Sequence, residues 1–195
     1  MREATVERKT AETDVRVSIN MDGTGQSQVN TGIGFFDHML TALCKHGYLD
    51  ATILCKGDLQ VDGHHTVEDV GIVFGTAIKQ AMGDRAGIVR YGTFFIPMDE
   101  ALCMCSLDFS GRPFLVFDCE YQGNACGDFD VQLAEEFFRG VAFAAGLTLH
   151  LKVLYGKNDH HKIEGLFKAF ARALDAASRL DDRVTGIPST KGILA

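Results

Sequence analysis

The feature that most constrains this chain is an internal repeat. The segments His64–Glu68 and His160–Glu164 both read H-H-x-x-E, and together they hold four of the seven histidines. After each block, apolar residues recur every three or four positions and coincide between the two copies. This spacing is typical of an amphipathic helix. We therefore expect equivalent helices over residues 64–82 and 160–179, each opened by its His-Glu block.

The segments before the two blocks also correspond, although at a shifted offset. In the first half the pattern predicts strands near 3–9 and 14–21, a helix near 33–46 and a strand near 49–56. In the second half it predicts strands near 101–109 and 113–120, a helix near 130–145 and a strand near 147–155. Each half thus reads strand-strand-helix-strand-helix. Two sheets, each with helices packed on one face, are the expected α+β arrangement.

Glycines at the middle of the chain indicate where the two units join. Gly83, Gly87 and Gly92 place the junction near residues 84–95. We expect a first repeat over residues 1–92, a second over 93–185, and a C-terminal tail over 186–195.

Composition excludes several classes of protein. With 195 residues and 46% hydrophobic content, the chain can bury a real core. A net charge of −7 argues against a general nucleic-acid binder, which needs clustered cations. No apolar run approaches a membrane span, the first ten residues lack a signal-peptide core, and the six cysteines form no C-x-x-C pair. We expect a cytoplasmic protein with buried reduced thiols and no nucleic-acid or membrane partner.

Helical geometry decides how the two blocks can bind metal ions. Residues four apart share a helix face, whereas neighbours diverge by about 100°. The first histidine and the glutamate of each block can therefore converge on one ion, while His65 and His161 point elsewhere. The simplest arrangement is two sites that exchange partners, with His161 joining His64 and Glu68, and His65 joining His160 and Glu164. Such ligands suit Zn, Mn, Fe, Co or Ni, and the sequence does not choose among them. The alternative is that the glutamates are ordinary first-turn residues favoured by the helix dipole.

The helix before each block offers further candidate ligands. His38 precedes the first block by about the same number of residues as Glu136 precedes the second. Glu136 can therefore be the repeat-equivalent of His38, although spacing alone leaves His38 equally open to a plain surface role.

Longer motifs make the chain resemble a known family over nearly its whole length. They are Glu12-Thr13, Thr31–Leu40, His64–Asp69, Pro97–Leu102, Ser110–Pro113, Thr148–His150, His160–Glu164, Phe167–Phe170 and Ile187–Gly192. In this order and spacing they resemble the imidazoleglycerol-phosphate dehydratases of histidine biosynthesis. The resemblance implies a fold like that of domain 2 of ribosomal protein S5, in two copies. It also implies removal of water from imidazole glycerol phosphate, two Mn²⁺ ions per active site, and a 24-subunit homo-oligomer with sites built between protomers.

The resemblance also implies roles for individual residues. One metal would take His38, His64, Glu68 and His161, and the other His65, Glu136, His160 and Glu164. The substrate would be bound by Glu12, His46, Arg90, Arg112, Lys168, Ser189, Thr190 and Lys191 together with the ligands His38, His64, His65, Glu68, His160 and His161. The chain departs from the family pattern at Glu136, where many members carry His, at Gly63, where Asp is usual, and at Ala42, where Gln is sometimes found.

The reaction explains why two metals are needed. The proton to be removed sits on an unactivated carbon, and the neighbouring hydroxyl is a poor leaving group. If both ring nitrogens bind metal, the ring can exist as an imidazolate, which expels the hydroxyl to give a diazafulvene-like intermediate with an acidic C–H bond. A general acid and a general base are still required. Glu12, Glu68 and Glu164 are the candidate catalytic carboxylates, and Glu12, which is not an expected ligand, is the least encumbered.

Two other functions compete with a metal-dependent lyase. A non-catalytic metal-binding or assembly module would not need Glu12, Arg90, Arg112 and Lys168, so their presence argues against it. A metal-dependent hydrolase of a phosphorylated small molecule would favour carboxylates bridging the two metals rather than a set dominated by histidine.

Overall fold

The computed structural model describes residues 2–194, in fourteen strands and helices over that range. In the first half the elements are β1 (Glu3–Lys9), β2 (Thr13–Asn20), β3 (Ser27–Asn30), α1 (Gly34–Gly47), β4 (Asp50–Gly57) and α2 (His64–Met82). In the second half they are β5 (Tyr91–Met98), β6 (Ala101–Asp108), β7 (Phe114–Asp118), β8 (Ala125–Cys126), β9 (Phe129–Asp130), α3 (Leu133–Ala145), β10 (Thr148–Tyr155) and α4 (Asp159–Ser178).

The two halves form sheets of the same topology. Their strand orders are β1-β2-β4-β3 and β5-β6-β10-β7, and β8 and β9 pair separately in a two-stranded sheet. In each large sheet the last pair is parallel, β3 with β4 and β7 with β10, whereas the other pairs are antiparallel. The predicted α+β class with a duplicated unit is confirmed.

The predicted unit lacked one strand of the large sheet in each half, and the two-residue strands β8 and β9 were not predicted either. In the first half β3 was missed, because its four residues, S-Q-V-N, are too few and too polar to show alternation. In the second half β5 was missed, because Gly92 was interpreted as a break in the chain. Gly92 lies inside β5, where a Cβ atom would collide with the backbone carbonyl of Ala173 in α4. It permits close packing of strand on helix. The repeat boundaries 1–92, 93–185 and 186–195 stay a proposal.

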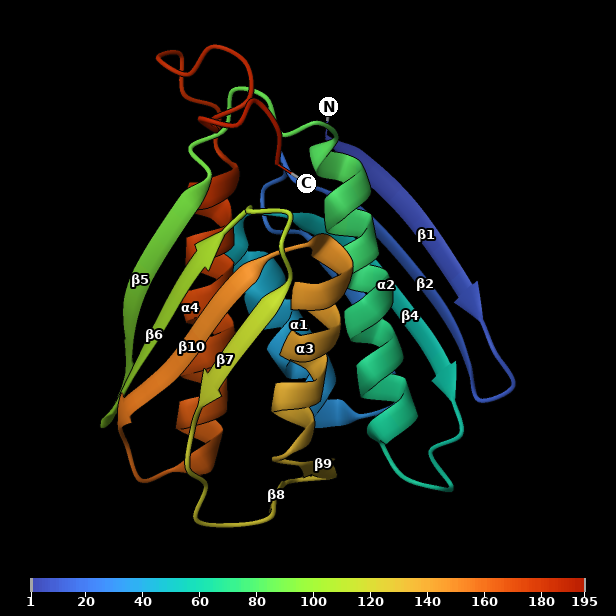
Figure 1. The fold of residues 1–195 in the computed structure, drawn as a ribbon. Coiled ribbons are helices and arrows are strands. Elements are labelled where there is room, and N and C mark those ends of the chain that lie inside the picture. The colour runs from blue at the N-terminus through green and yellow to red at the C-terminus, as the bar shows by residue number, and fades with distance from the viewer. Residues whose placement is uncertain (1, 195) are drawn as a thin grey trace.

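The four helices lie between the two large sheets, which form the outer layers of the molecule (Figure 1). α2 packs on β1 and β2, and α4 packs on β5 and β6. Helices also pack across the two halves: α1 contacts α4, and α3 contacts α2. At the second of these seams the backbones approach closely. A Cβ at Gly71 would lie 2.6 Å from the carbonyl oxygen of Phe137, and one at Gly140 would lie 2.9 Å from the amide nitrogen of Ile72.

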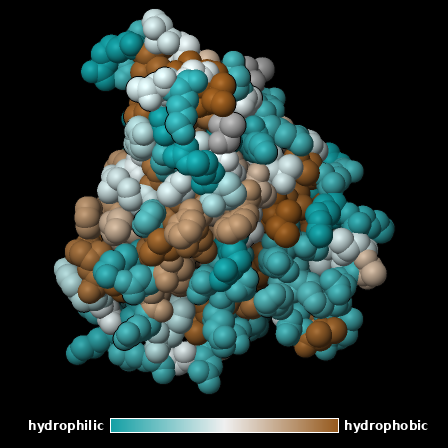
Figure 2. Space-filling view, viewed as in Figure 1, coloured by the Kyte–Doolittle hydropathy of each residue, from teal (hydrophilic) through white to brown (hydrophobic). Residues whose placement is uncertain are grey.

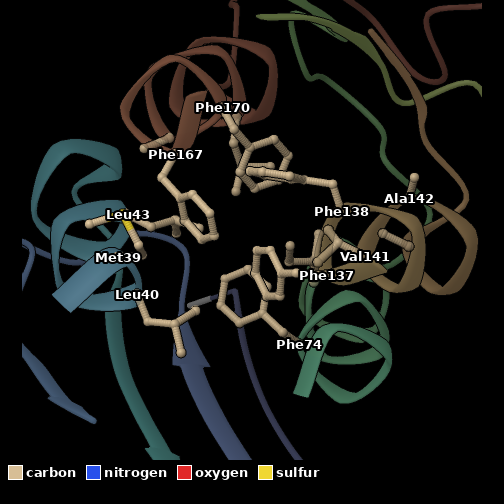
Figure 3. Close-up of a cluster of buried hydrophobic side chains, with 14 of the residues drawn as sticks. Met39, Leu40, Leu43, Phe74, Phe137, Phe138, Val141, Ala142, Phe167 and Phe170 are labelled. Carbon is tan, nitrogen blue, oxygen red and sulfur yellow. The ribbon is translucent and has the colours of Figure 1, made fainter. Parts of the chain in front are cut away.

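A cluster of phenylalanines fills the space between the helices (Figure 3). The rings of Phe137 and Phe167 stack with centroids 5.1 Å apart, and the ring of Phe138 lies 4.8 Å from that of Phe167. Phe74 of α2 contacts the ring of Phe137, and Phe170 of α4 contacts the ring of Phe138. Because these large side chains are fully buried and interlocked, they fix the relative positions of the helices that carry the His-Glu blocks.

The cysteines are unpaired, as expected. Three are buried and three are partly buried, and none forms a disulfide among residues 2–194. Burial raises the pKa of the Cys103 thiol to about 12, so it stays protonated and unreactive. Over the same described range, no helix is both long and apolar enough to cross a membrane.

Candidate active site

The tightest group of metal-ligand side chains lies where α1 meets α4. His38 of α1 and His160 and Glu164 of α4 each offer one ligand atom, and these atoms all lie within 4.8 Å of one another. Oε2 of Glu164 is 3.0 Å from Nε2 of His160 and 3.5 Å from Nε2 of His38. The first histidine and the glutamate of this block thus share a helix face, as the spacing predicts.

Glu164 is an ionised carboxylate in a nearly buried position. Only 8% of its side chain is exposed, and Nζ of Lys168, one turn along α4, lies 2.6 Å from its Oε1. Burial opposes ionisation, but the charge and hydrogen bond of Lys168, with help from His160 and His38, hold the pKa of Glu164 below its usual range. His46 lies in the same region, where burial and then the charge of Lys168 lower its pKa.

The start of α4 is fixed by a side-chain cap. The Oδ1 atom of Asn158 accepts hydrogen bonds from the backbone N–H groups of His160 and His161, at 2.9 and 3.3 Å. Such a cap satisfies amides that have no partner within the helix. It also sets where the two histidines leave the first turn.

The block on α2 is more open. Nε2 of His64 is 3.9 Å from Oε2 of Glu68, and both side chains are more than 40% exposed. His65 turns away to contact two carboxylates: its Nδ1 lies 3.1 Å from Asp58, and its Nε2 lies 3.7 Å from Glu12 in the β1–β2 turn. The hydrogen bond to Asp58 raises the pKa of His65.

His161 diverges from its neighbour in the same way. Its Nδ1 lies 2.7 Å from Oε2 of Glu100 and its Nε2 3.5 Å from Asp99, both in the β5–β6 turn. The rings of His160 and His161 are inclined at 76°, and those of His64 and His65 at 89°. The structure therefore separates the two histidines of each block.

Among the described residues of this chain, neither expected ligand set comes together at one place. His38 lies with His160 and Glu164, whereas the family resemblance assigns it to the other ion. Glu136 of α3 is 28% exposed and pairs with Arg139, its Oε2 lying 3.3 Å from Nε. These positions leave both expected sets as proposals.

The expected phosphate-binding residues divide between two places. Lys168 lies beside Glu164, as described above. Arg90 lies just before β5, where it donates two hydrogen bonds to Asp108 and a third, of 2.7 Å, to the carbonyl of Pro188. That contact holds the tail bearing Ser189, Thr190 and Lys191, and exposed Arg112 follows β6 at the same end. Figure 1 shows this tail at the end of the molecule opposite the starts of α2 and α4.

The sequence did not single out Asp58 or Glu100. Both lie in connections rather than on a helix face, so no periodicity reports them. Glu100 belongs to the motif Pro97–Leu102, which indicated the family but not a role for this residue.

A duplicated α+β fold that carries paired His-Glu clusters, one of them with three ligand atoms close together, defines a candidate metal-binding enzyme. The model of the imidazoleglycerol-phosphate dehydratase family matches residues 31–174. The dehydratase of Acetivibrio thermocellus is 60% identical over 97% of both chains, and that of Ruminiclostridium cellulolyticum is 59% identical over the full length of both.

Solved structures agree with the sequence relatives. The dehydratase of Staphylococcus aureus superposes with a TM-score of 0.84 at 41% identity, covering 92% of this chain and 99% of that one. The dehydratase of Pyrococcus furiosus also superposes with a TM-score of 0.84, at 35% identity, covering 97% of this chain and 100% of that one. The chain belongs to the imidazoleglycerol-phosphate dehydratase family. The family and the enzyme class expected from the sequence motifs, a hydro-lyase, are thereby confirmed.

Proposed function

We propose that this chain converts imidazole glycerol phosphate into imidazole acetol phosphate and water in histidine biosynthesis, using two Mn²⁺ ions per site. The observation that supports this most is the cluster of His38, His160 and Glu164, with Lys168 against the same carboxylate. Three ligand atoms within 4.8 Å, beside a fixed cation, suit a metal that works next to an anionic substrate.

The donor atoms in this cluster fit manganese. They are imidazole nitrogens and carboxylate oxygens without a thiolate, a set that Mn²⁺ accepts together with several other divalent metals. We propose manganese among these metals because of the family resemblance. The proposed sets are His38, His64, Glu68 and His161 for one ion, and His65, Glu136, His160 and Glu164 for the other.

Distances within the chain support a site completed by other copies. α2 has 19 residues, so about 28 Å separates its His-Glu block from its far end. The tail and Arg90 lie at that far end. The three-carbon chain that joins ring and phosphate in the proposed substrate cannot span such a length. We therefore propose that the block of one protomer meets the tail of another, in an assembly of 24 subunits.

The surface offers a face for such assembly. Tyr91, Phe95, Phe114 and Val116 alternate along edge strands β5 and β7 of the second sheet, and each is more than a third exposed. Figure 2 shows apolar atoms gathered over this sheet. Exposed apolar patches commonly mark contacts between proteins.

The chain's own residues would supply positioning and proton transfer. Arg90, Arg112, Lys168, Ser189, Thr190 and Lys191 would hold the phosphate, and Glu12 and His46 would line the pocket. Bound to the two ring nitrogens, the metal ions would act as Lewis acids that stabilise negative charge on the ring. Glu12, Glu68 and Glu164 are the proposed acid and base groups. Glu12 lies on a hairpin turn next to His65, so its carboxylate can reach a ring held there.

The assay is direct. Purified protein, Mn²⁺ and imidazole glycerol phosphate should yield the ketone product, and light scattering should give the mass of a large homo-oligomer. Absence of product at full metal occupancy would favour a non-catalytic module, and release of phosphate would favour a hydrolase. A fully active monomer would contradict the shared site. The unpaired thiols are consistent with the proposed cytoplasmic location.

A further inference from the structure

The second histidine of each block has one ring nitrogen held by a carboxylate. Nδ1 of His65 lies 3.2 and 3.1 Å from the two oxygens of Asp58. Nδ1 of His161 lies 2.7 Å from Oε2 of Glu100. Because an ionised carboxylate only accepts hydrogen bonds, the proton of the neutral ring must sit on Nδ1 in both cases.

These two carboxylates come from non-equivalent parts of the repeat. Asp58 belongs to the connection between β4 and α2, immediately before its own helix. Glu100 belongs to the turn between β5 and β6 and reaches α4 from another element. Both halves therefore have a carboxylate bonded to Nδ1 of the second histidine, but different connections supply it. Duplication of one ancestral unit does not explain this similarity.

Glu100 is itself firmly placed. Its Oε1 accepts the backbone N–H groups of Lys157 and Asn158, at 3.0 and 2.7 Å. The backbone hydrogen bond from Asn158, then the bond with His161, lower the pKa of Glu100 to about 2. One carboxylate thus joins the β5–β6 turn, the entry to α4 and the His161 ring.

The arrangement leaves the same atom free on both rings. With Nδ1–H bonded to a carboxylate, Nε2 carries the lone pair and faces away from the holding group. A second carboxylate lies near each Nε2 without a hydrogen bond to it, Glu12 at 3.7 Å from His65 and Asp99 at 3.5 Å from His161. Metal-bound histidines commonly have this pattern, in which the far ring nitrogen donates to a carboxylate that orients the ring.

We propose that Asp58 and Glu100 are positioning residues that hold His65 and His161 as Nδ1–H tautomers and so present Nε2 of each ring to a metal ion. This inference rests on the proposed function, which makes both histidines ligands. Glu100 has the stronger effect, because its bond is shorter and its carboxylate is anchored twice to the backbone.

The test compares Asp58→Asn and Glu100→Gln in the full-length assembled protein. Both variants keep the size of the side chain but lose its charge, and an amide can also donate, so the ring is no longer confined to one tautomer. Mn²⁺ affinity is measured from the EPR signal of the free ion. We expect the Mn²⁺ affinity to fall about 10- to 100-fold, with the larger loss for Glu100→Gln. Asp14→Asn and Glu7→Gln are matched controls, since each removes an exposed ion pair on the first sheet.

A second readout is independent of metal and of catalysis. Solid-state NMR of metal-free protein labelled with ¹⁵N-histidine should show Nδ1–H signals for His65 and His161 that weaken in the matching variant. A thermal melting temperature close to wild type shows that the variant is folded. Unchanged Mn²⁺ affinity in both variants, or Nε2–H tautomers in the wild type, would overturn the inference. Failure of the wild-type protein to bind Mn²⁺ would instead contradict the proposed function.

Discussion

Replacing Gly71 with alanine tests the close seam between α2 and α3. Two opposite effects are involved. Alanine is a better helix former than glycine by about 1 kcal/mol, so the isolated helix would gain stability. Against this, the new Cβ would lie 2.6 Å from the carbonyl oxygen of Phe137, whereas ordinary contacts begin near 3.4 Å. The helices must therefore separate by a few tenths of an ångström or more.

The seam gives little room for that movement. A Cβ at Gly75 on α2 would likewise lie 2.6 Å from a backbone oxygen of α3, and one at Gly140 on α3 would lie 2.9 Å from the backbone of α2. Phe137 stacks on Phe167, so shifting α3 disturbs the core as well. Overpacking of this kind costs about 1–3 kcal/mol. We expect the packing cost to exceed the helix gain, with a net loss of up to about 2 kcal/mol in the free energy of unfolding.

The measurement is urea unfolding of metal-free protein followed by circular dichroism, at fixed protein concentration because assembly contributes to stability. Gly34→Ala is the matched control. It lies at the start of α1 with no atom within 4 Å of the new Cβ, so it should be neutral or slightly stabilising. If Gly71→Ala is as stable as that control, the helices are not held at backbone contact and the reasoning fails.

Three further outcomes follow from the site. Lys191→Ala should raise the KM for substrate strongly while metal content stays normal; an unchanged KM would remove the tail from the phosphate site. Thr13→Val should lower kcat more than it raises KM, because Thr13 ties the turn that carries Glu12 to buried Asp69 of α2; Thr13→Ser should restore the rate, and failure to do so would refute this tie. Cys103, whose pKa burial raises to about 12, should resist iodoacetamide at pH 8 until urea unfolds the chain; rapid alkylation of the folded protein would contradict its burial.

The sequence predicts the helices better than the strands, for physical reasons. α2 occupies the predicted residues 64–82, because an apolar stripe at helical spacing persists over five turns. β3 has four residues and almost no apolar character, so only its pairing with β4 makes it a strand. β5 begins beside glycines, and one of them serves packing rather than a turn.

The site shows the same division between local and long-range information. The separation of His64 from His65, and of His160 from His161, follows from helical geometry alone, and the structure shows it. The contacts of Asp58 and Glu100 depend on where connections fold back, which periodicity does not report. The distance between the His-Glu blocks and the tail depends on the length of α2 and α4, and no local sequence pattern reports it.

The glutamates of the two His-Glu blocks differ in burial and in charge environment. Glu164 is nearly buried and paired with Lys168, whereas Glu68 is 44% exposed and has Ile72 at the position equivalent to that lysine. One block therefore presents a carboxylate already neutralised by a cation, and the other presents a carboxylate free to take a full positive charge. The proposed substrate is equally asymmetric, since its ring carries the reacting chain on one side only. If the two blocks bind the two ring nitrogens as proposed, each nitrogen meets a different charge environment, and Lys168 is one of the residues that make the two blocks differ.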